Sequence, residues 1–307
     1  MPIDRTRPDF CPLTVSRIPA IEKFSRMRGN RFCDRTTGIL YMWAKQCDTQ
    51  YAEFGGMHLL RSVWGGRRVY ACPFGDGDLD AALDAIAADA EADGEVLAFA
   101  SLSHEEAERI AAHFGGGERL TDEGWNDYLY SAAALAEFAG RAYHGMRNHV
   151  NRFCALYPDY VYTPLTPEQI EDVSAFYAVQ RIAADDGTES AAAEADAAAE
   201  LLALYPTLVE AGAPLLGGVL TVSGEIVGFS IGEIVDDTLY IHVEKGNIAY
   251  SGVYPMLVRE FARRVSEMGI QWINREEDDG NPGLRRSKLA YRPTAQLEKT
   301  VLVVSRS

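Results

Sequence analysis

The chain has 307 residues, a length that fits one large domain or two modest ones. Its apolar and charged fractions, 47% and 24%, are typical of a soluble globular protein, and no apolar run is long enough to cross a membrane. The formal charge of −16 argues against DNA or non-specific nucleic-acid binding, although it leaves room for a local basic channel. The first twenty residues lack the apolar core of a signal peptide, so we expect a cytoplasmic protein.

The five cysteines are scattered along the chain and form no CxxC pair. They are Cys11, Cys33, Cys47, Cys72 and Cys154. This spacing differs from that of zinc ligands, and it predicts reduced, packed thiols and no bound metal.

The first half of the sequence alternates between strand and helix patterns. Helices are predicted over residues 18–27, from Leu79 to Gly94, and over 104–114, where Ser103 serves as the cap. Strands are predicted over residues 51–63, 68–72, 96–100 and 127–130. The strand at 127–130 is expected to close this half.

The second half repeats that order of elements. Strands are predicted over 216–222, 226–233, 239–244, from Ile270, and over 296–304, with helices after Ser251 and near Leu284. The repeat predicts an α/β (α+β) protein with two similar domains side by side. We place an N-terminal domain at residues 1–131, a connecting basic helix at 132–160 and a C-terminal domain at 161–307.

The connecting segment reads as one helix from Ala132 to Tyr157, and its middle, GRAYHGMRNHVNRF, is the densest basic and amide-rich stretch of an acidic chain. His144, Arg147 and Asn148 cluster on one broad face of such a helix. Two interpretations stay open. The face is either a solvated linker surface or a positive wall that lines a cleft and binds the acceptor.

Residues 238–293 form a strand, a small-residue loop, a helix and a second strand. Ser251 and Gly252 come just before the helix, so the free N–H groups of its first turn, with Val253, could bind a phosphate or carboxylate. Lys245 adds a charge nearby. The alternative is an ordinary capped helix that binds nothing. The equivalent loop of the first half carries carboxylates that repel phosphate, so we expect the chemistry in the second half.

Charged residues follow directly on the second strand of this unit, where ligands bind in open α/β sheets. Arg275 could clamp an anion, and Glu276 or Glu277 could accept a proton if burial raised its pKa. The alternative interpretation is a loop whose acidic residues favour the next helix N-terminus.

The short basic stretch GLRRSKLAY ends in Tyr291. Arg285 and Lys288 lie at helical spacing and could reach a polyphosphate, while Tyr291 could protonate a leaving group or pack in the core. Hydrolase triads, HExxH, Walker loops and GxGxxG motifs are absent from the sequence, so those classes lack support.

The order of strand, loop, helix, strand, short helix with terminal tyrosine, and strand resembles the GNAT acyltransferase fold. The strings INREEDDGNPGLRRSKLAYRP, YHGMRNHVNRF, IVGFSIGEI and IHVEKG are similar to a bacterial family related to the C-terminal domain of phosphatidylglycerol lysyltransferase. The resemblance implies two tandem GNAT-like domains, each a mixed, mostly antiparallel sheet flanked by helices, with a degenerate N-terminal copy. It also implies transfer of an aminoacyl or acyl group onto an amine or hydroxyl.

In this hypothesis Glu276 is the general base and Tyr291 the general acid. Donor-binding residues are expected to be Lys245, Ser251, Gly252, Val253, Arg285 and Lys288. Acceptor-binding residues are expected to be His144, Arg147, Asn148 and Arg275.

The resemblance leaves the substrates open. We expect no tightly bound cofactor, and aminoacyl-tRNA or acyl-CoA as the co-substrate, with a small molecule or lipid headgroup as acceptor. The loop AYSGVY departs from the glycine-rich pattern of coenzyme A users, and the transmembrane half of the lipid-modifying synthases is not found. The alternatives are an acyl-CoA-dependent N-acetyltransferase and a non-catalytic protein that binds a small anion.

Overall fold

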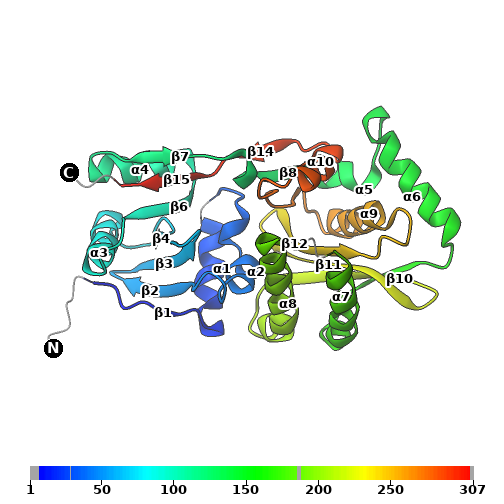
Figure 1. Ribbon diagram of the computed structural model, residues 1–307, viewed down its shortest axis with the longest axis horizontal. Helices are drawn as coiled ribbons and strands as arrows, with labels where there is room; N and C mark the ends of the chain where they lie inside the picture. Colours follow the sequence, from blue (N-terminus) through cyan, green and yellow to red (C-terminus); the bar gives the residue numbers. More distant parts are fainter. Residues whose placement is uncertain (1–6, 28, 185–187, 305–307) are drawn as a thin grey trace.

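The computed structural model describes residues 7–27, 29–184 and 188–304, and it arranges them as two sheets with helices against their faces (Figure 1). The α-helices are α1 (Ile18–Met27), α2 (Thr37–Met42), α3 (Leu79–Ala92), α4 (His104–Phe114), α5 (Ala132–Glu137), α6 (His144–Leu156), α7 (Ile170–Ala184), α8 (Glu189–Glu210), α9 (Val253–Glu267) and α10 (Pro282–Ala290). Short 3-10 helices are η1 (Val15–Arg17), η2 (Cys33–Arg35), η3 (Glu123–Trp125), η4 (Arg141–Tyr143) and η5 (Pro167–Gln169).

The first sheet has the strand order β1-β2-β3-β4-β6-β15-β7, with β5 pairing to β3. Its strands are β1 (Cys11–Pro12), β2 (Gln50–Phe54), β3 (Met57–Trp64), β4 (Arg67–Tyr70), β5 (Phe74–Gly75), β6 (Ala98–Leu102), β7 (Glu118–Leu120) and β15 (Thr300–Val303). The predicted strand over 51–63 is therefore a hairpin, because Gly55 and Gly56 take positive φ and turn the chain between β2 and β3.

The second sheet has the order β14-β8-β13-β12-β11-β10-β9. Its strands are β8 (Asp127–Ser131), β9 (Val161–Pro164), β10 (Leu215–Val222), β11 (Glu225–Val235), β12 (Thr238–Gly246), β13 (Trp272–Asn274) and β14 (Ala295–Leu297). Both sheets are mixed and mostly antiparallel, with parallel pairing between β4 and β6 and between β12 and β13. The predicted α/β architecture of two such sheets flanked by helices is confirmed.

The two halves exchange strands, which corrects the predicted assignment at both ends of the domains. β8, expected to close the first half, pairs with β13 and β14 in the second sheet. β15, expected in the second half, pairs with β6 and β7 in the first sheet. Alternation in a sequence gives the two faces of a strand and does not identify the strand beside it, so periodicity could not reveal this exchange.

The segment that carries α1 and α2 also crosses between the halves. Ile18 and Ile21 of α1, with Met42 of α2, share an apolar core with Phe229 and Ile231 of β11. Figure 1 shows this pair of helices between the first sheet and α8. Sequence proximity suggested a place within the first domain, but burial against the second sheet decides where this amphipathic segment packs.

Helices cover both faces of the second sheet. Alternate residues of β10 show this arrangement, because Val219 belongs to the core under α7 and α8, while Leu220 belongs to the core under α5, α6 and α9. The core of the first sheet is separate and includes Phe99 of β6 and Leu302 of β15.

The connecting segment is not one helix, contrary to the prediction. α5 ends where Phe138 takes a left-handed conformation, with φ of 48°, and the chain then passes through Gly140 and η4 before α6 begins. Phe138 is fully buried, so packing of its ring stabilises a conformation that is unfavourable for a residue with a side chain.

A search of the described residues finds no helix with both the length and the apolar character that crossing a bilayer requires.

The strand exchange makes the C-terminal strand part of the first core, and this can be tested with Leu302→Ala. Leu302 is fully buried, so the substitution should lower the free energy of unfolding by about 2–5 kcal/mol. Val303→Thr, at a half-buried neighbour, is the control and should cost much less. Urea unfolding measures both variants, and equal, small losses would contradict the placement of β15 in this core.

Candidate active site

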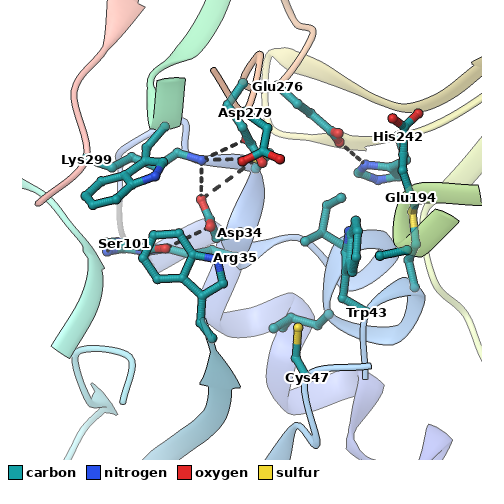
Figure 2. Close-up of a pocket in the computed structure, with 18 of the residues that line it drawn as sticks. Asp34, Arg35, Trp43, Cys47, Ser101, Glu194, His242, Glu276, Asp279 and Lys299 are labelled. Carbon is teal, nitrogen blue, oxygen red and sulfur yellow. Dashed lines mark hydrogen bonds and ion pairs between the residues drawn. The ribbon is translucent and has the colours of Figure 1, made fainter. Parts of the chain in front are cut away.

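A cavity of about 700 Å³ lies between the two halves of the molecule. Its lining comes from α2, β3 and β4 on one side, and from α8, β12 and the loop after β13 on the other. Figure 2 shows Glu276, Asp279 and His242 along one edge, and Trp43 and Cys47 along another. The volume is in the range of pockets that hold metabolites and cofactors.

A buried imidazole on β12 lies between two carboxylates. His242 Nδ1 is 2.8 Å from Glu276 Oε1, and its Nε2 is 3.3 Å from Glu233 Oε2. Burial opposes a charge on His242, but hydrogen bonds with Glu233 and Glu276 outweigh it and raise its pKa to about 9. At neutral pH the imidazole is therefore protonated, and both nitrogens donate hydrogen bonds.

Glu233 joins this imidazole to the first turn of α2. Its carboxylate accepts hydrogen bonds from the backbone N–H of Thr37, at 2.9 Å, and from that of Gly38. The side chain of Thr36, at the N-cap position, makes no capping bond, so Glu233 takes over that function from another strand. A Cβ on Gly38 would lie 2.3 Å from His242 Nε2, so only glycine allows this approach.

The backbone around Glu276 is held in an unusual conformation. Its φ is 59°, and its N–H donates to the side-chain oxygen of Asn274 at 2.7 Å. The ammonium of Lys288 donates hydrogen bonds to the carbonyl oxygens of residues 275–277, at 2.6 Å for Glu277 and 3.0 Å for Glu276. Backbone strain of this kind is common at functional sites, and here it directs Glu276 toward the cavity.

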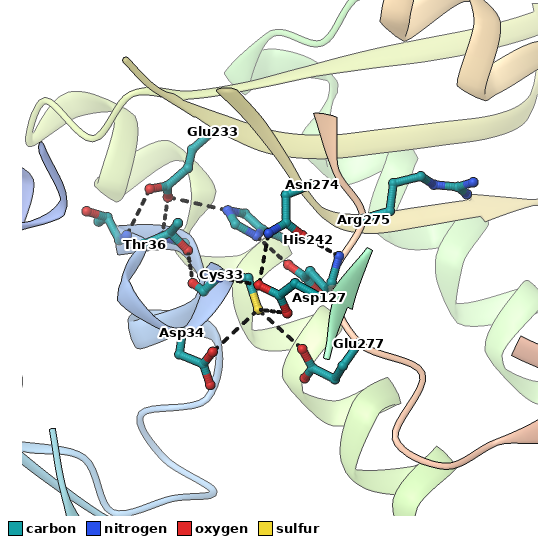
Figure 3. Close-up of polar contacts among 12 residues, drawn as sticks. Cys33, Asp34, Thr36, Asp127, Glu233, His242, Asn274, Arg275 and Glu277 are labelled. Atoms are coloured by element: carbon teal, nitrogen blue, oxygen red, sulfur yellow. Dashed lines mark hydrogen bonds and ion pairs between the residues drawn. The ribbon is translucent and has the colours of Figure 1, made fainter. Parts of the chain in front are cut away.

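A second polar cluster surrounds Lys299, the residue just before β15 (Figure 3 shows its partners). Its ammonium lies 2.5 Å from Asp34, 2.7 Å from Asp127 and 3.1 Å from Glu277. The thiol of Cys33 donates to Asp127 at 3.2 Å and to Glu277 at 3.3 Å. Three carboxylates therefore share one lysine.

Burial and charge divide the protons in the Lys299 cluster unequally. Burial raises the pKa of Asp127 to about 7, whereas the Lys299 ammonium overcomes burial and lowers the pKa of Glu277 to about 2. Burial also raises the pKa of Cys33, which stays a thiol. Cys33, Asp34 and Asp127 offer ligand atoms within 4.8 Å of one another, a spacing that suits a metal ion, but the Lys299 ammonium supplies the positive charge there.

The tyrosine and arginine predicted for catalysis and acceptor binding contact each other. Arg275 pairs with Glu244 at 2.8 Å, and its guanidinium lies 4.5 Å from the centre of the Tyr291 ring. Tyr291 is 3% exposed, belongs to the core of the second sheet and does not line the cavity. The alternative that Tyr291 packs in the core is therefore the correct one, and its hydroxyl does not reach a substrate in this cavity.

The other predicted residues divide into two groups. Four that line the cavity are Lys245, Arg275, Glu276 and Lys288. The three cations among them already have strong partners, because Lys245 pairs with Glu194 at 2.7 Å, Lys288 donates to carbonyls and Arg275 pairs with Glu244. These side chains therefore add positive charge and structural support to the site, and they are not free to bind a polyphosphate.

The predicted anion loop does not line the cavity. Gly252 takes a φ of 91°, and a Cβ built on it would lie 2.5 Å from the carbonyl oxygen of His149, so α6 packs closely over this loop. Ser251, Gly252 and Val253 are absent from the cavity lining, whereas Tyr254, one residue on, is part of it. The packing of α6 against this loop leaves the tip of α9 outside the described cavity.

The side chains on α6 and α10 that were expected to bind donor or acceptor make hydrogen bonds within the protein instead. Arg147 donates to the carbonyls of Phe138 and Gly140, and it thereby caps the end of α5. His144 and Asn148 are exposed on α6 and bond to each other at 3.2 Å. Arg285 is held by Asp278 at 2.8 and 3.0 Å. None of these four side chains lines the described cavity.

Sequence reasoning assigned no role to several residues at the centre of this site. They are Cys33, Asp34, Asp127, Glu233, His242 and Lys299. For His242 a signal existed, because it is a titratable residue between the apolar Ile241 and Val243 of a strand. The others lie far apart in sequence, and only the exchanged strands and the crossing segment bring them together.

The fold defines a class of architecture, the tandem GNAT-like proteins. Solved structures with this architecture include the L-PGS of Bacillus licheniformis, at 15% identity and a TM-score of 0.64 over 94% of this chain and 92% of that chain. The C-terminal domain of a lysylphosphatidylglycerol synthetase from Agrobacterium fabrum has 14% identity and a TM-score of 0.63 over 95% and 92%.

Within that class the family is clear. Residues 26–302 match the family described as phosphatidylglycerol lysyltransferase, C-terminal, and the chain belongs to this family. A conserved protein of unknown function from Bacteroides thetaiotaomicron is 32% identical, with a TM-score of 0.88 over 97% of this chain and 100% of that chain. No curated protein sequence matches the chain.

The charge on His242 predicts a pH-dependent stability. The folded pKa of about 9 exceeds the ordinary value of about 6.5, so the contribution is complete below about pH 6.5 and is lost as pH rises through 9. Between pH 6.5 and 9.5 the free energy of unfolding should therefore fall in both proteins, but the fall should be smaller in His242→Gln than in the native protein, by about 3 kcal/mol. Denaturant unfolding at several pH values measures this, and parallel curves for the two proteins would refute a charged His242.

The close approach at Gly38 predicts that a single methyl group disrupts the site. Gly38→Ala should lower the free energy of unfolding by about 2–3 kcal/mol, because its Cβ meets His242 and Glu233. Gly145→Ala is the matched control, since α6 leaves open space there and helix propensity favours alanine by about 1 kcal/mol. Thermal unfolding compares the pair, and a tolerated Gly38→Ala would show that α2 does not dock this closely.

Proposed function

We propose that this protein transfers an aminoacyl group from an aminoacyl-tRNA to an amine or hydroxyl acceptor, with the reaction in the cavity between its halves. The observation that carries the proposal is the placement of Glu276. Its carboxylate lines the cavity, its backbone is held by Asn274 and Lys288, and His242 fixes one of its oxygens. Membership of the lysyltransferase family supports aminoacyl transfer as the type of reaction.

Glu276 is suited to the role of general base. Burial raises the pKa of Glu276, although His242 opposes this, and a raised pKa brings a carboxylate closer to the working pH. The amine or hydroxyl of the acceptor attacks the ester carbonyl and gives its proton to Glu276. A C–N or C–O bond forms, the ester C–O bond breaks, and the same proton passes to the departing ribose oxygen. One carboxyl group can serve both steps, so the buried Tyr291 is not needed.

His242 and Glu233 act by positioning that base. Glu233 is held by the N-terminus of α2, His242 is held by Glu233, and Glu276 is held by His242. Because carboxylates accept from both ring nitrogens, the imidazole stays protonated and in one orientation. The reactive oxygen of Glu276 is thereby fixed relative to the bound ester.

The packing of the α9 tip favours tRNA over acyl-CoA as donor. A CoA donor would need the N–H groups at Ser251 and Gly252 for its pyrophosphate, and α6 packs over this loop. A tRNA donor places only its acylated 3′ end in the cavity, and its contacts with the rest of the protein can be weak and local. The same donor is consistent with a cytoplasmic protein.

The test is a transfer assay with separate donors. Purified protein is incubated with tRNA charged with labelled amino acids, or with labelled acyl-CoAs, together with a pool of amines, nucleosides and lipids. Loss of tRNA-bound label and appearance of a new labelled product are expected, and Glu276→Gln should slow the transfer by about 10²–10⁴-fold.

Glu210→Gln is the control, because Glu210 is exposed at the end of α8, far from the lining residues. It should transfer at the normal rate. Consumption of acyl-CoA instead of charged tRNA would overturn the donor assignment. Full activity in Glu276→Gln would overturn the assignment of the base.

A further inference from the structure

The cavity has two chemically different ends. Three of the four tryptophans in the chain, Trp43, Trp64 and Trp125, line it, and the rings of Trp64 and Trp125 meet edge to face with centres 4.9 Å apart. Trp43 and Cys47 lie along one edge (Figure 2), and the apolar lining from α2, β3 and β4 also includes Ile39, Leu40, Met42, Leu60, Val69 and Ala71. This apolar end is formed by α2, the residues after it, and β3 and β4 of the first sheet.

The other end carries more carboxylates than its cation can neutralise. Asp34 and Glu277 both pair with Lys299, which also pairs with the buried Asp127. The side chains of Asp34 and Glu277 are 34% and 36% exposed, so part of each faces the cavity. A second positive group beside them would therefore be stabilised by charge attraction at low local dielectric.

We propose that this cavity selects an aminoacyl group with an apolar side chain, either aromatic or branched, and that this protein does not transfer a lysyl group. The inference rests on the proposed function and names its substrate class. The α-amine of the aminoacyl group lies at Asp34 and Glu277, and its side chain lies beside Trp43, among the apolar side chains of α2, β3 and β4. The ester carbonyl then lies toward Glu276, which borders the same charged end.

The free energy of burying apolar surface favours an apolar side chain over a cationic one in this cavity. Burying a side chain of the size of leucine or phenylalanine stabilises the complex by about 1.5–3 kcal/mol, or roughly tenfold or more in affinity. A lysine side chain that reached the same end would lose its hydration, since the apolar side chains that form that end carry no charge. Glu194, which also lines the cavity, already pairs with Lys245.

The position of the tryptophans provides a direct binding signal. Amino-acid amides imitate the aminoacyl ester, and their binding to the intact protein can be followed by tryptophan fluorescence and confirmed by calorimetry. Phenylalaninamide or leucinamide should bind at least tenfold more tightly than lysinamide. Both should also bind at least tenfold more tightly than 3-phenylpropanamide, which lacks the amine. Lysinamide binding as tightly as the apolar amides, or the amine making no difference, would overturn the inference.

Two pairs of variants separate the ends of the cavity. Cys47→Phe fills the apolar end and should weaken phenylalaninamide at least tenfold, whereas Cys47→Ala keeps the space and should bind nearly as well as the native protein. Asp34→Asn should weaken the amides at least fivefold but leave 3-phenylpropanamide unchanged. Its control is Asp172→Asn, at an exposed position on α7, which should not change the affinity of either ligand. Unchanged affinity in both Cys47→Phe and Asp34→Asn would place the amides elsewhere.

The transfer assay keeps this inference distinct from the proposed function. If lysyl-tRNA is consumed and tRNAs that carry apolar amino acids are not, aminoacyl transfer stands and the substrate class falls. If the apolar amides bind as described but no charged tRNA is consumed, the cavity assignment stands and the transfer reaction falls. Amines without a carbonyl, such as phenethylamine, test whether the cavity binds an acceptor amine instead of an aminoacyl group. If phenethylamine binds as tightly as phenylalaninamide, the cavity recognises an acceptor amine, and the aminoacyl assignment is overturned.

Discussion

The carboxylate of Glu233 is the contact on which this site depends. It is fully buried, so its charge is tolerated only because α2 supplies two N–H groups and His242 supplies a cation. The carboxylate thereby fixes the N-terminal segment against the second sheet and fixes the imidazole that holds Glu276. Removal of any member deprives a buried charged group of one of its partners, which explains why one stretch of the first half approaches a strand of the second so closely.

The exchange of strands has a related consequence. The chain passes from the first sheet to the second at Asp127, the first residue of β8, and returns at Lys299, just before β15. These two residues meet at 2.7 Å. The two crossings are therefore joined by one ion pair, and the carboxylates gathered around it form the charged end of the cavity. The cavity belongs to neither half alone, because residues from both halves line it and Asp34 of the first half meets Glu277 of the second at Lys299.

Much of the fold could be predicted from periodicity. The strands 226–233 and 239–244 and the helix after Ser251 follow clear alternation or helical spacing, and they occur close to the predicted bounds. The break of the connecting helix was missed because it depends on burial of Phe138, a tertiary effect. The pairing of β8 and β15 with strands of the other half could not be predicted, since alternation carries no information about which strand lies alongside.

The candidate site could be predicted only where chemistry and local position coincide. Glu276 and Arg275 follow a buried strand, and both line the cavity. Ser251 and Tyr291 have suitable chemistry, but α6 packs over the loop that contains Ser251, and Tyr291 is enclosed in the core. His242 carried a signal in the sequence, as a titratable residue between two apolar residues of a strand. Its importance became visible only with Glu233, since a buried charge is explained by its partner and not by its neighbours in the chain.

The central claim is that Glu276 acts on an aminoacyl ester in this cavity. The most direct measurement is a crystal structure of the protein with a stable amide-linked analogue of the acylated 3′ end of tRNA. The account predicts that the analogue occupies the cavity, with its carbonyl carbon within about 4 Å of the Glu276 carboxylate. An analogue bound elsewhere, or bound with that carbonyl on the far side of the cavity from Glu276, would contradict it.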